Sequence, residues 1–450
     1  MNLFDDLFRC PQVEHIYSEA EHLQSMLHFE AALARAEALV GLVPESAARV
    51  ITAKCRADFI EREEIARGAA ISGNLAIPLV KQLTILVAKE DQSAAHFVHW
   101  GATSQDVIDT ASVLQLRRAL ELIDRDLRSL TATLSSLSET YRLTPIVART
   151  WMQQALPSTF GFVAAGWLDA VLRDRERLDE IRPRVLTLQF GGAVGTLAAL
   201  GEHGPAIASA LAEDLRLALP AAPWHTHRDR PAEAATTIGL CCGTLTKIAR
   251  DISLLSQTEI AEVSEPFSEG RGGSSSMPHK RNPVTCAIIL AAGLRVPPLV
   301  NSMLSSMVQE EARGLGGWQA EWETLPEIVR LTAGALHHLT KVLPSLQVHP
   351  DRMWQNLELT NGLIFAEPVS MALAKRIGKM PAHQLLEAAC KTAVNENRHL
   401  KDVLRSDPLL ANNLTPAEID DLFDPQKYLG SAGVFIDAVL SKARRQLSAS

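Results

Sequence analysis

The sequence has few aromatic residues, no long basic run and no cysteine pair at redox or zinc spacing. Aromatic residues make up only 5% of the 450 residues, whereas hydrophobic residues make up 47%, which indicates aliphatic interiors between packed helices. The net charge of -8, from 44 basic and 52 acidic residues, argues against nucleic acid or an anionic membrane as a partner. We expect a large soluble core, and any anionic substrate would need local positive charge.

Cysteine and histidine usage predicts neither disulfides nor a metal site. The cysteines are Cys10, Cys55, Cys241, Cys242, Cys286 and Cys390. Without a C-x-x-C pair they form no zinc-finger or disulfide framework. His225 and His227 also lack a third ligand at metal spacing. A reducing cytosol is the simplest setting, and no metal is implied.

Export signals, membrane spans and nucleotide motifs are also not indicated. The first six residues lack the basic flank and apolar core of a signal peptide. The apolar run 287–294 is followed by Arg295, Pro297 and Pro298, which break it as a span. The glycine segment 191–196 does not open as G-x-G-x-x-G and has no P-loop lysine. We expect a cytoplasmic chain without a cofactor.

Apolar residues at helical spacing give the clearest structural signal. The longest stripe is Leu116, Leu120, Ile123, Leu127, Leu130, Leu134 and Leu137. Its steps of four and three contain no Gly or Pro, so it predicts a long bundle helix. Two further helices are predicted by similar stripes over 167–181 and 245–255. Strand signals are weak, and we predict a mainly α fold with at most a small sheet.

Helical sequence is interrupted at 101–109 and at 348–350, where turn residues or a proline occur. These breaks place domain boundaries near residues 110 and 350. We therefore predict an N-terminal helical domain at 1–110, a central helix-bundle domain at 111–350 and a C-terminal helical domain at 351–450.

The richest motif is the segment 273–283, which reads G-S-S-S-M-P-H-K-R-N-P. It gathers hydroxyl groups, a cation and an amide, a set suited to an anionic substrate. Its form, G-S-x-x-M-P-x-K-x-N-P, resembles the signature loop of the fumarase/aspartase superfamily, whose members make or break a bond β to a carboxylate through a carbanion. The resemblance implies a catalytic loop at 265–283, with Ser274 as the proton-transfer group and Ser275 as the alternative. It also implies that Lys280 and Asn282 hold the substrate carboxylate.

Residues 99–106, H-W-G-A-T-S-Q-D, fit the superfamily's H-x-G-x-T-S-x-D segment. In the relatives it resembles, this segment binds a substrate carboxylate. The resemblance therefore implies binding by Thr103, Ser104 and Gln105, because their N–H and O–H groups can converge on one anion. The alternative for Thr103 or Ser104 is a cap of the following helix. His99 is a candidate acid–base group or a structural hydrogen-bond donor.

Residues 149–161 are similar to the superfamily's R-T-H-x-Q-x-A-x-P-x-T-x-G segment, with Trp151 where the lyases have histidine. The resemblance implies substrate binding by Arg149, Thr150, Trp151 and Gln153. Indole donates a hydrogen bond but cannot supply a proton near neutral pH. A carboxylate leaving group, with a conjugate-acid pKa of about 4, needs no such proton.

Residues 224–230, W-H-T-H-R-D-R, resemble a run found in the cycloisomerase branch of the superfamily and in related lyases. Arg228 and Arg230 could make bidentate contacts with carboxylates. The alternative, weighed equally for Arg230 and Asp229, is an ion pair that holds a helix start.

These resemblances imply an intramolecular lyase that converts 3-carboxy-cis,cis-muconate, a small tricarboxylate, into a carboxymuconolactone in aromatic catabolism. The superfamily layout also implies a homotetramer with a shared helical core and active sites shared between subunits. Two alternatives stay open: a carbon–nitrogen lyase of the adenylosuccinate lyase type, and a catalytically silent homologue.

Overall fold

The computed structural model describes residues 3–266, 272–273, 277 and 279–448, and they divide into two compact units. Unit 1 comprises Met1–Asp126, Asp174–Leu245 and Ile288–His337. Unit 2 comprises Leu127–Arg173, Thr246–Ala287 and His338–Ser450. The domain boundaries near residues 110 and 350 stay a prediction.

Long helices contain the points at which the chain passes from one unit to the other. They are α7 (Ser104–Thr140), α8 (Phe160–Val185), α10 (Asp229–Leu255), α11 (Val284–Ser305) and α12 (Gly317–Val342). The predicted stripe on α7 is buried from Leu116 to Leu134, and Leu137 is half-buried. The stripes predicted over 167–181 and 245–255 lie on α8 and α10. The prediction of a mainly α, long-helix fold is confirmed.

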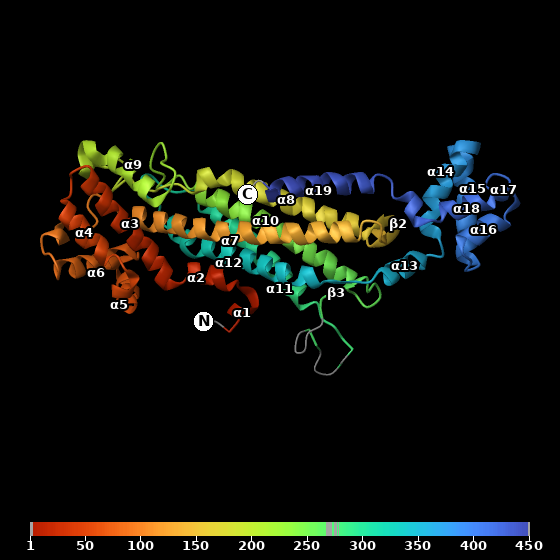
Figure 1. The fold of residues 1–450 in the computed structure, drawn as a ribbon, viewed down its shortest axis with the longest axis horizontal. Coiled ribbons are helices and arrows are strands. Elements are labelled where there is room, and N and C mark those ends of the chain that lie inside the picture. Colours follow the sequence, from red (N-terminus) through yellow and green to blue (C-terminus); the bar gives the residue numbers. More distant parts are fainter. Residues whose placement is uncertain (1–2, 267–271, 274–276, 278, 449–450) are drawn as a thin grey trace. The chain divides into compact units, whose positions relative to one another are not determined.

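The rest of unit 1 consists of α3, which has 21 residues, and of shorter helices, and α3, α4, α6 and α9 gather there (Figure 1). The elements are α1 (Asp5–Phe8), α2 (Pro11–Ile16), α3 (Glu19–Leu39), α4 (Glu45–Lys54), η1 (Ala57–Phe59), α5 (Arg62–Ser72), α6 (Ala76–Ala88), η2 (Ala94–Phe97), η3 (Ala198–His203) and α9 (Gly204–Leu215). Their apolar faces form one core, in which Met26, Phe29 and Leu83 are fully buried.

Unit 2 contains the strands of the described chain and a group of short C-terminal helices (Figure 1). The strands are β1 (Pro145–Thr150), β2 (Gln153–Thr159), β3 (Val263–Ser264) and β4 (Gln347–Val348). The helices are η4 (Leu343–Ser345), α13 (Pro350–Glu358), η5 (Leu363–Phe365), α14 (Ala366–Ile377), α15 (Lys379–Asn395), α16 (Leu400–Ser406), α17 (Pro408–Ala411), α18 (Pro416–Leu422), η6 (Pro425–Tyr428) and α19 (Ala432–Ser448). β1 pairs antiparallel with β2, and β3 with β4. The sheets are small, as the sequence predicts.

Helix α11 is long and apolar enough, by length and composition, to cross a membrane, but one such helix is weak evidence for a span. It carries Arg295, Pro297 and Pro298 within its length. Only 33% of its most apolar window is buried within this chain, and Leu294 is largely exposed. Such a surface is typical of a helix that packs against another protein chain.

Candidate active site

The start of α7 is held by a buried carboxylate. Asp106 is fully buried, and it accepts hydrogen bonds from the backbone N–H groups of Gly191 (3.0 Å) and Gly192 (2.9 Å). His225 Nε2 lies 2.8 Å from the same carboxylate. Gln105, also fully buried, donates to the His225 carbonyl at 2.8 Å. This network fixes the glycine segment and the W-H-T-H-R-D-R segment against one helix terminus.

Thr103 and Ser104 lie at that same terminus and are half-buried. The Thr103 N–H donates to Asp106 Oδ2 at 3.1 Å, and the Thr103 carbonyl accepts from the Asp106 N–H at 3.0 Å. These reciprocal bonds form the first turn of α7, which Ser104 opens. Helix-start geometry is therefore present, and it leaves N–H groups that suit an anion.

Arg228 is buried between two carboxylates. Its guanidinium donates to Asp109 at 2.7 and 3.1 Å and to Glu321 at 2.5 and 3.0 Å. Burial opposes the charge of Arg228, but Asp109 and Glu321 together raise its pKa. The indole Nε1 of Trp318 donates to Asp109 at 2.9 Å. Arg228 thus holds elements of unit 1 together, and its role in substrate binding stays a prediction.

Arg230 makes weaker contacts. It donates to the Arg184 carbonyl and, at 3.3 Å, to Thr187 Oγ1. Arg228 and Arg230 both line a cavity of about 790 Å³ in unit 1. Arg230 keeps donors that no carboxylate of the described residues binds, so substrate binding stays open for it.

His99 is held by a buried glutamate that the sequence analysis did not identify. Its Nδ1 lies 2.7 Å from Glu30 Oε1, and Glu30 is almost completely buried. His99 has a left-handed backbone with φ of +59°, a strained conformation for this residue. Burial alone would lower the pKa of His99, but the charge and hydrogen bond of Glu30 and the charge of Asp106 raise it. This arrangement directs the other ring nitrogen away from Glu30.

Glu37 follows Glu30 on α3 and has an exposed fraction of 0%. Neither of its carboxylate oxygens has a hydrogen-bond partner among the described residues. Burial, followed by the charge of Glu30, raises the pKa of Glu37 to about 9. Glu37 is therefore neutral at physiological pH. The sequence signal for this pair is two acidic residues seven positions apart, between which every residue except Arg35 is apolar.

In unit 2, Arg149 at the end of β1 is tied to a second buried glutamate. Its Nη1 and Nη2 donate to Glu262 at 2.9 and 2.8 Å, and Glu262 is fully buried. Asn356 Nδ2 donates to the same carboxylate at 2.8 Å. A bidentate pair of this kind positions Arg149 firmly.

The hairpin between β1 and β2 has Trp151 and Met152 as its two turn residues. Both have positive φ, +54° and +63°, the pattern of a type I′ turn that Asn and Gly normally form. Trp151 is 97% exposed and Met152 71% exposed. Thr150 and Gln153, which pair across the turn, are exposed as well. The chain thus presents a large indole on a strained turn, and the described residues bury almost none of that indole to offset the strain.

Ser274 and Ser275 lie outside the described residues. Lys280 is exposed and forms no ion pair within the described part of the chain. Asn282 is half-buried, and its N–H donates to the Gly272 carbonyl at 2.9 Å. Gly272 has φ of +69°, and a Cβ there would lie 2.8 Å from the Asn282 carbonyl oxygen. Only glycine fits this close approach.

The base of the same loop is fixed by Glu265. Its carboxylate accepts the backbone N–H groups of Thr285 at 3.1 Å and Cys286 at 2.9 Å. These N–H groups belong to the first turn of α11, so Glu265 caps that helix from outside.

The predicted site residues fall into two sets. Unit 1 contains His99, Thr103, Ser104, Gln105, Arg228 and Arg230, and unit 2 contains Arg149, Thr150, Trp151, Gln153, Lys280 and Asn282. Arg230 and Lys280 form no ion pair with a described residue. Buried carboxylates hold the other predicted cations, which are His99, Arg228 and Arg149. Sequence reasoning missed these carboxylates because each is distant in the chain from the group it binds.

Comparison with known proteins establishes the class of this chain. The model of the lyase family matches residues 9–297, and a model of the adenylosuccinate lyase C-terminus matches residues 362–439. The chain belongs to the fumarase/aspartase superfamily, as its motifs predict.

Particular relatives narrow the class. The chain is 51% identical over 440 residues to 3-carboxy-cis,cis-muconate cycloisomerase of Pseudomonas aeruginosa, covering 98% of this chain and 96% of the relative. It is 48% identical to the enzyme of the same name from Acinetobacter baylyi, covering 98% of both. The crystal structure of 3-carboxy-cis,cis-muconate lactonizing enzyme from Pseudomonas putida matches with a TM-score of 0.94 and 50% identity, covering 98% of this chain and 99% of that one.

Proposed function

We propose that this chain is an intramolecular lyase that converts 3-carboxy-cis,cis-muconate into a carboxymuconolactone, a step of protocatechuate catabolism. The observation that carries the proposal is the 51% identity to a cycloisomerase over nearly the whole chain. Trp151 also supports this proposal, because its indole cannot donate a proton to a leaving group. A lyase that expels an amine needs a proton donor, whereas a carboxylate leaves as a stable anion.

In the lactonising direction, one substrate carboxylate attacks the conjugated double bond and forms a C–O bond. The π electrons move into the neighbouring carboxylate and generate an enediolate. A hydroxyl of the catalytic loop, Ser274 or Ser275, then gives its proton to the carbon next to that carboxylate. Lys280 and Asn282 stabilise the enediolate, and fixed donors of this kind are the largest catalytic contribution available.

The charge distribution fits these roles. Lys280 is exposed and makes no ion pair with a described residue, so its ammonium group can meet a carboxylate. Arg149 is different, because Glu262 already binds two of its nitrogens. Its part in catalysis would be to hold the hairpin and to offer its remaining donor.

We further propose a cytoplasmic homotetramer whose subunits share active sites. Two features support it: the indole of Trp151 on a strained, exposed turn, and the exposed apolar surface of α11. Both are costly in an isolated chain, and contact with other copies would remove the cost. Trp151 of one subunit would then complete a site that contains the catalytic loop of another.

The activity test follows the loss of conjugated-diene absorbance on addition of 3-carboxy-cis,cis-muconate. The wild type should consume the diene, and Ser274→Ala should lower kcat by at least about 1000-fold. Ser275→Ala separates the two serines, and Ser46→Ala, an exposed serine on α4, is the matched control. Fumarate release from an amino-linked succinate without diene loss would instead establish a carbon–nitrogen lyase. No turnover of either substrate would establish a silent homologue.

The shared-site proposal has its own test. Ser274→Ala and Trp151→Gly variants are co-expressed with different tags, and mixed tetramers are isolated. If the two residues serve one site from different subunits, some sites contain both native residues and activity returns. A mixture as inactive as its parents, or a monomer by sedimentation, would contradict the proposal.

A further inference from the structure

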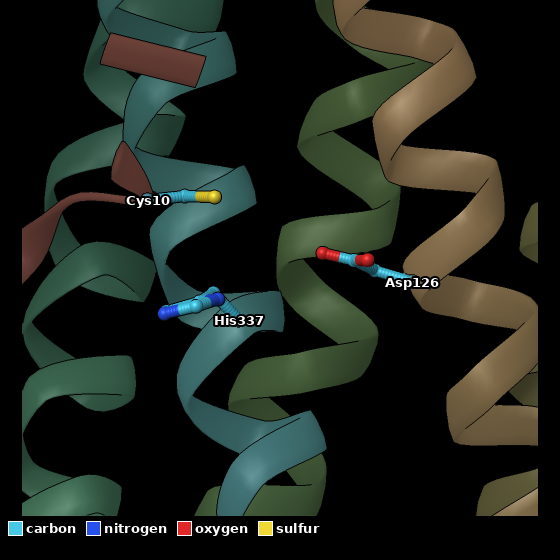
Figure 2. A group of neighbouring side chains, drawn as sticks. All are labelled: Cys10, Asp126 and His337. Carbon is cyan, nitrogen blue, oxygen red and sulfur yellow. The ribbon is translucent and has the colours of Figure 1, made fainter. Parts of the chain in front are cut away.

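Three side chains with metal-binding atoms converge in unit 1, and none of them is among the residues predicted to bind substrate. They are Cys10, Asp126 and His337, and one ligand atom of each lies within 4.8 Å of the other two. Figure 2 shows that Cys10 comes from the segment before α2, Asp126 from α7 and His337 from α12. Three separate parts of the chain thus meet at one point.

The chemistry of this set favours zinc over harder cations. It offers one sulfur, one nitrogen and one oxygen ligand, all of which zinc binds at about 2.0–2.3 Å, whereas Mg²⁺ and Ca²⁺ take oxygen ligands. Tetrahedral geometry at those bond lengths separates ligand atoms by roughly 3.3–3.8 Å. Closing from 4.8 Å requires shifts of about 1 Å, which a side-chain adjustment can supply.

The burial of these three side chains and the groups next to them also suit a metal site. Cys10 is 2% exposed, and Asp126 and His337 are half-buried. Gln12 Oε1 lies 3.0 Å from Cys10 Sγ, so an amide oxygen is at hand for a fourth position. Arg125 donates to Asp126 Oδ1 at 2.9 and 2.8 Å. That contact orients the carboxylate and leaves Oδ2 for a metal, as outer-shell partners do in zinc sites.

We propose that Cys10, Asp126 and His337 form a structural binding site for a zinc-class divalent ion, with Gln12 Oε1 as the fourth ligand. Binding converts the Cys10 thiol into a thiolate and releases its proton to solvent. The thiolate and the Asp126 carboxylate then balance the two charges of the ion. The bound ion would tie the segment before α2 to α7 and α12. No motif signals this site, because its ligands are far apart in the sequence.

The test uses the full, tag-free chain after treatment with a chelator. Isothermal titration with Zn²⁺ should show one ion bound per chain, and Co²⁺ should give tetrahedral d–d bands with a thiolate-to-cobalt charge-transfer band. Cys10→Ser should abolish the charge-transfer band and weaken Zn²⁺ binding by at least about 100-fold. Asp126→Asn and His337→Gln should each weaken it at least about tenfold.

Matched variants separate this site from adventitious binding. Cys390→Ser removes the half-buried thiol of a cysteine outside this cluster and should leave Zn²⁺ binding unchanged. Zn²⁺ should also raise the Tm of the wild type, since it binds the folded state, and should raise the Tm of Asp126→Asn by less at the same Zn²⁺ concentration. Equal Zn²⁺ binding by wild type and Cys10→Ser, or a cobalt spectrum without the thiolate band, would overturn the proposal. Diene turnover after chelation should equal that of the zinc-loaded enzyme, which keeps this test independent of the proposed activity.

Discussion

The start of α7 and the tip of the β1–β2 hairpin both carry residues predicted to bind substrate, but their surroundings differ. At the start of α7, Asp106 and Asp109 are buried, and several donors within the same unit bind each of them. At the hairpin tip, Trp151 is 97% exposed on a left-handed backbone. The buried network of the first region forms within one unit. The second region places an indole on a strained turn, and the described residues bury almost none of it.

The difference separates two ways in which a residue contributes to a site. Substitutions in the buried network should reduce stability first and activity as a consequence. Substitutions at the exposed tip should reduce activity while leaving the folded chain intact. The following variants test this separation, from the largest expected effect to the smallest.

Arg228→Met should destabilise the chain most. It leaves Asp109 and Glu321 as uncompensated buried carboxylates, and breaking such a group costs about 3–5 kcal/mol. Chemical denaturation followed by circular dichroism measures the free energy of unfolding. Arg230→Met is the control, because the Arg230 side chain contacts only a carbonyl and a hydroxyl of the described residues. This change should lower the free energy of unfolding by less than about 1 kcal/mol. Equal losses of unfolding free energy for the two variants would remove the distinction between buried Arg228 and half-buried Arg230.

Trp151→Gly should show the opposite pattern. Glycine removes the strain of the left-handed backbone but increases the conformational entropy of the unfolded chain. Because these effects oppose each other, the free energy of unfolding should stay within about 1 kcal/mol of wild type. Loss of the indole should lower kcat/KM roughly 100-fold. Met152→Gly makes the same backbone change at the neighbouring position and should affect kcat/KM less. A Trp151→Gly enzyme with normal kcat/KM would show that the indole has no part in the site.

Glu37→Gln should change how stability depends on pH. The pKa of Glu37 is raised to about 9 in the folded chain, from an ordinary 4.5. The unfolded chain therefore loses this proton at lower pH, and wild-type stability should fall as pH rises from about 4.5 toward 9. The glutamine variant does not lose stability in this way. The free energy of unfolding of Glu37→Gln, relative to that of the wild type, should therefore increase by about 1–3 kcal/mol from pH 5 to pH 7. Glu202→Gln, on an exposed glutamate, should run parallel to wild type.

Glu30→Gln is expected to have the smallest effect. It keeps an acceptor for His99 Nδ1 but removes the charge that raises the pKa of His99. If His99 titrates in the reaction, the corresponding limb of the kcat/KM profile should move to lower pH. An unchanged profile with a normal fold would assign His99 a structural role only.

Sequence pattern predicted α7, α8 and α10 because their apolar residues repeat at helical spacing, which is a local property. The superfamily was predictable because the loop motif holds its glycine, lysine and asparagine within a short segment. The ion pairs of Arg228 with Glu321 and of Arg149 with Glu262 were not predictable, since each joins residues about a hundred positions apart. The exposed Trp151 turn escaped prediction because neither Trp nor Met carries a type I′ signal.

The loop that carries Ser274 is closed twice at its base. Glu265 reaches across to the N–H groups of Thr285 and Cys286, and inside that closure the Gly272 carbonyl receives the Asn282 N–H. These two contacts fix Glu265 and Gly272 on one side of the Ser274 segment to α11 and Asn282 on the other side. Changes inside the loop can therefore alter chemistry without disturbing α11. Conversely, adding or removing a single residue between Gly272 and Asn282 should shift the proposed catalytic groups of this loop relative to these two contacts.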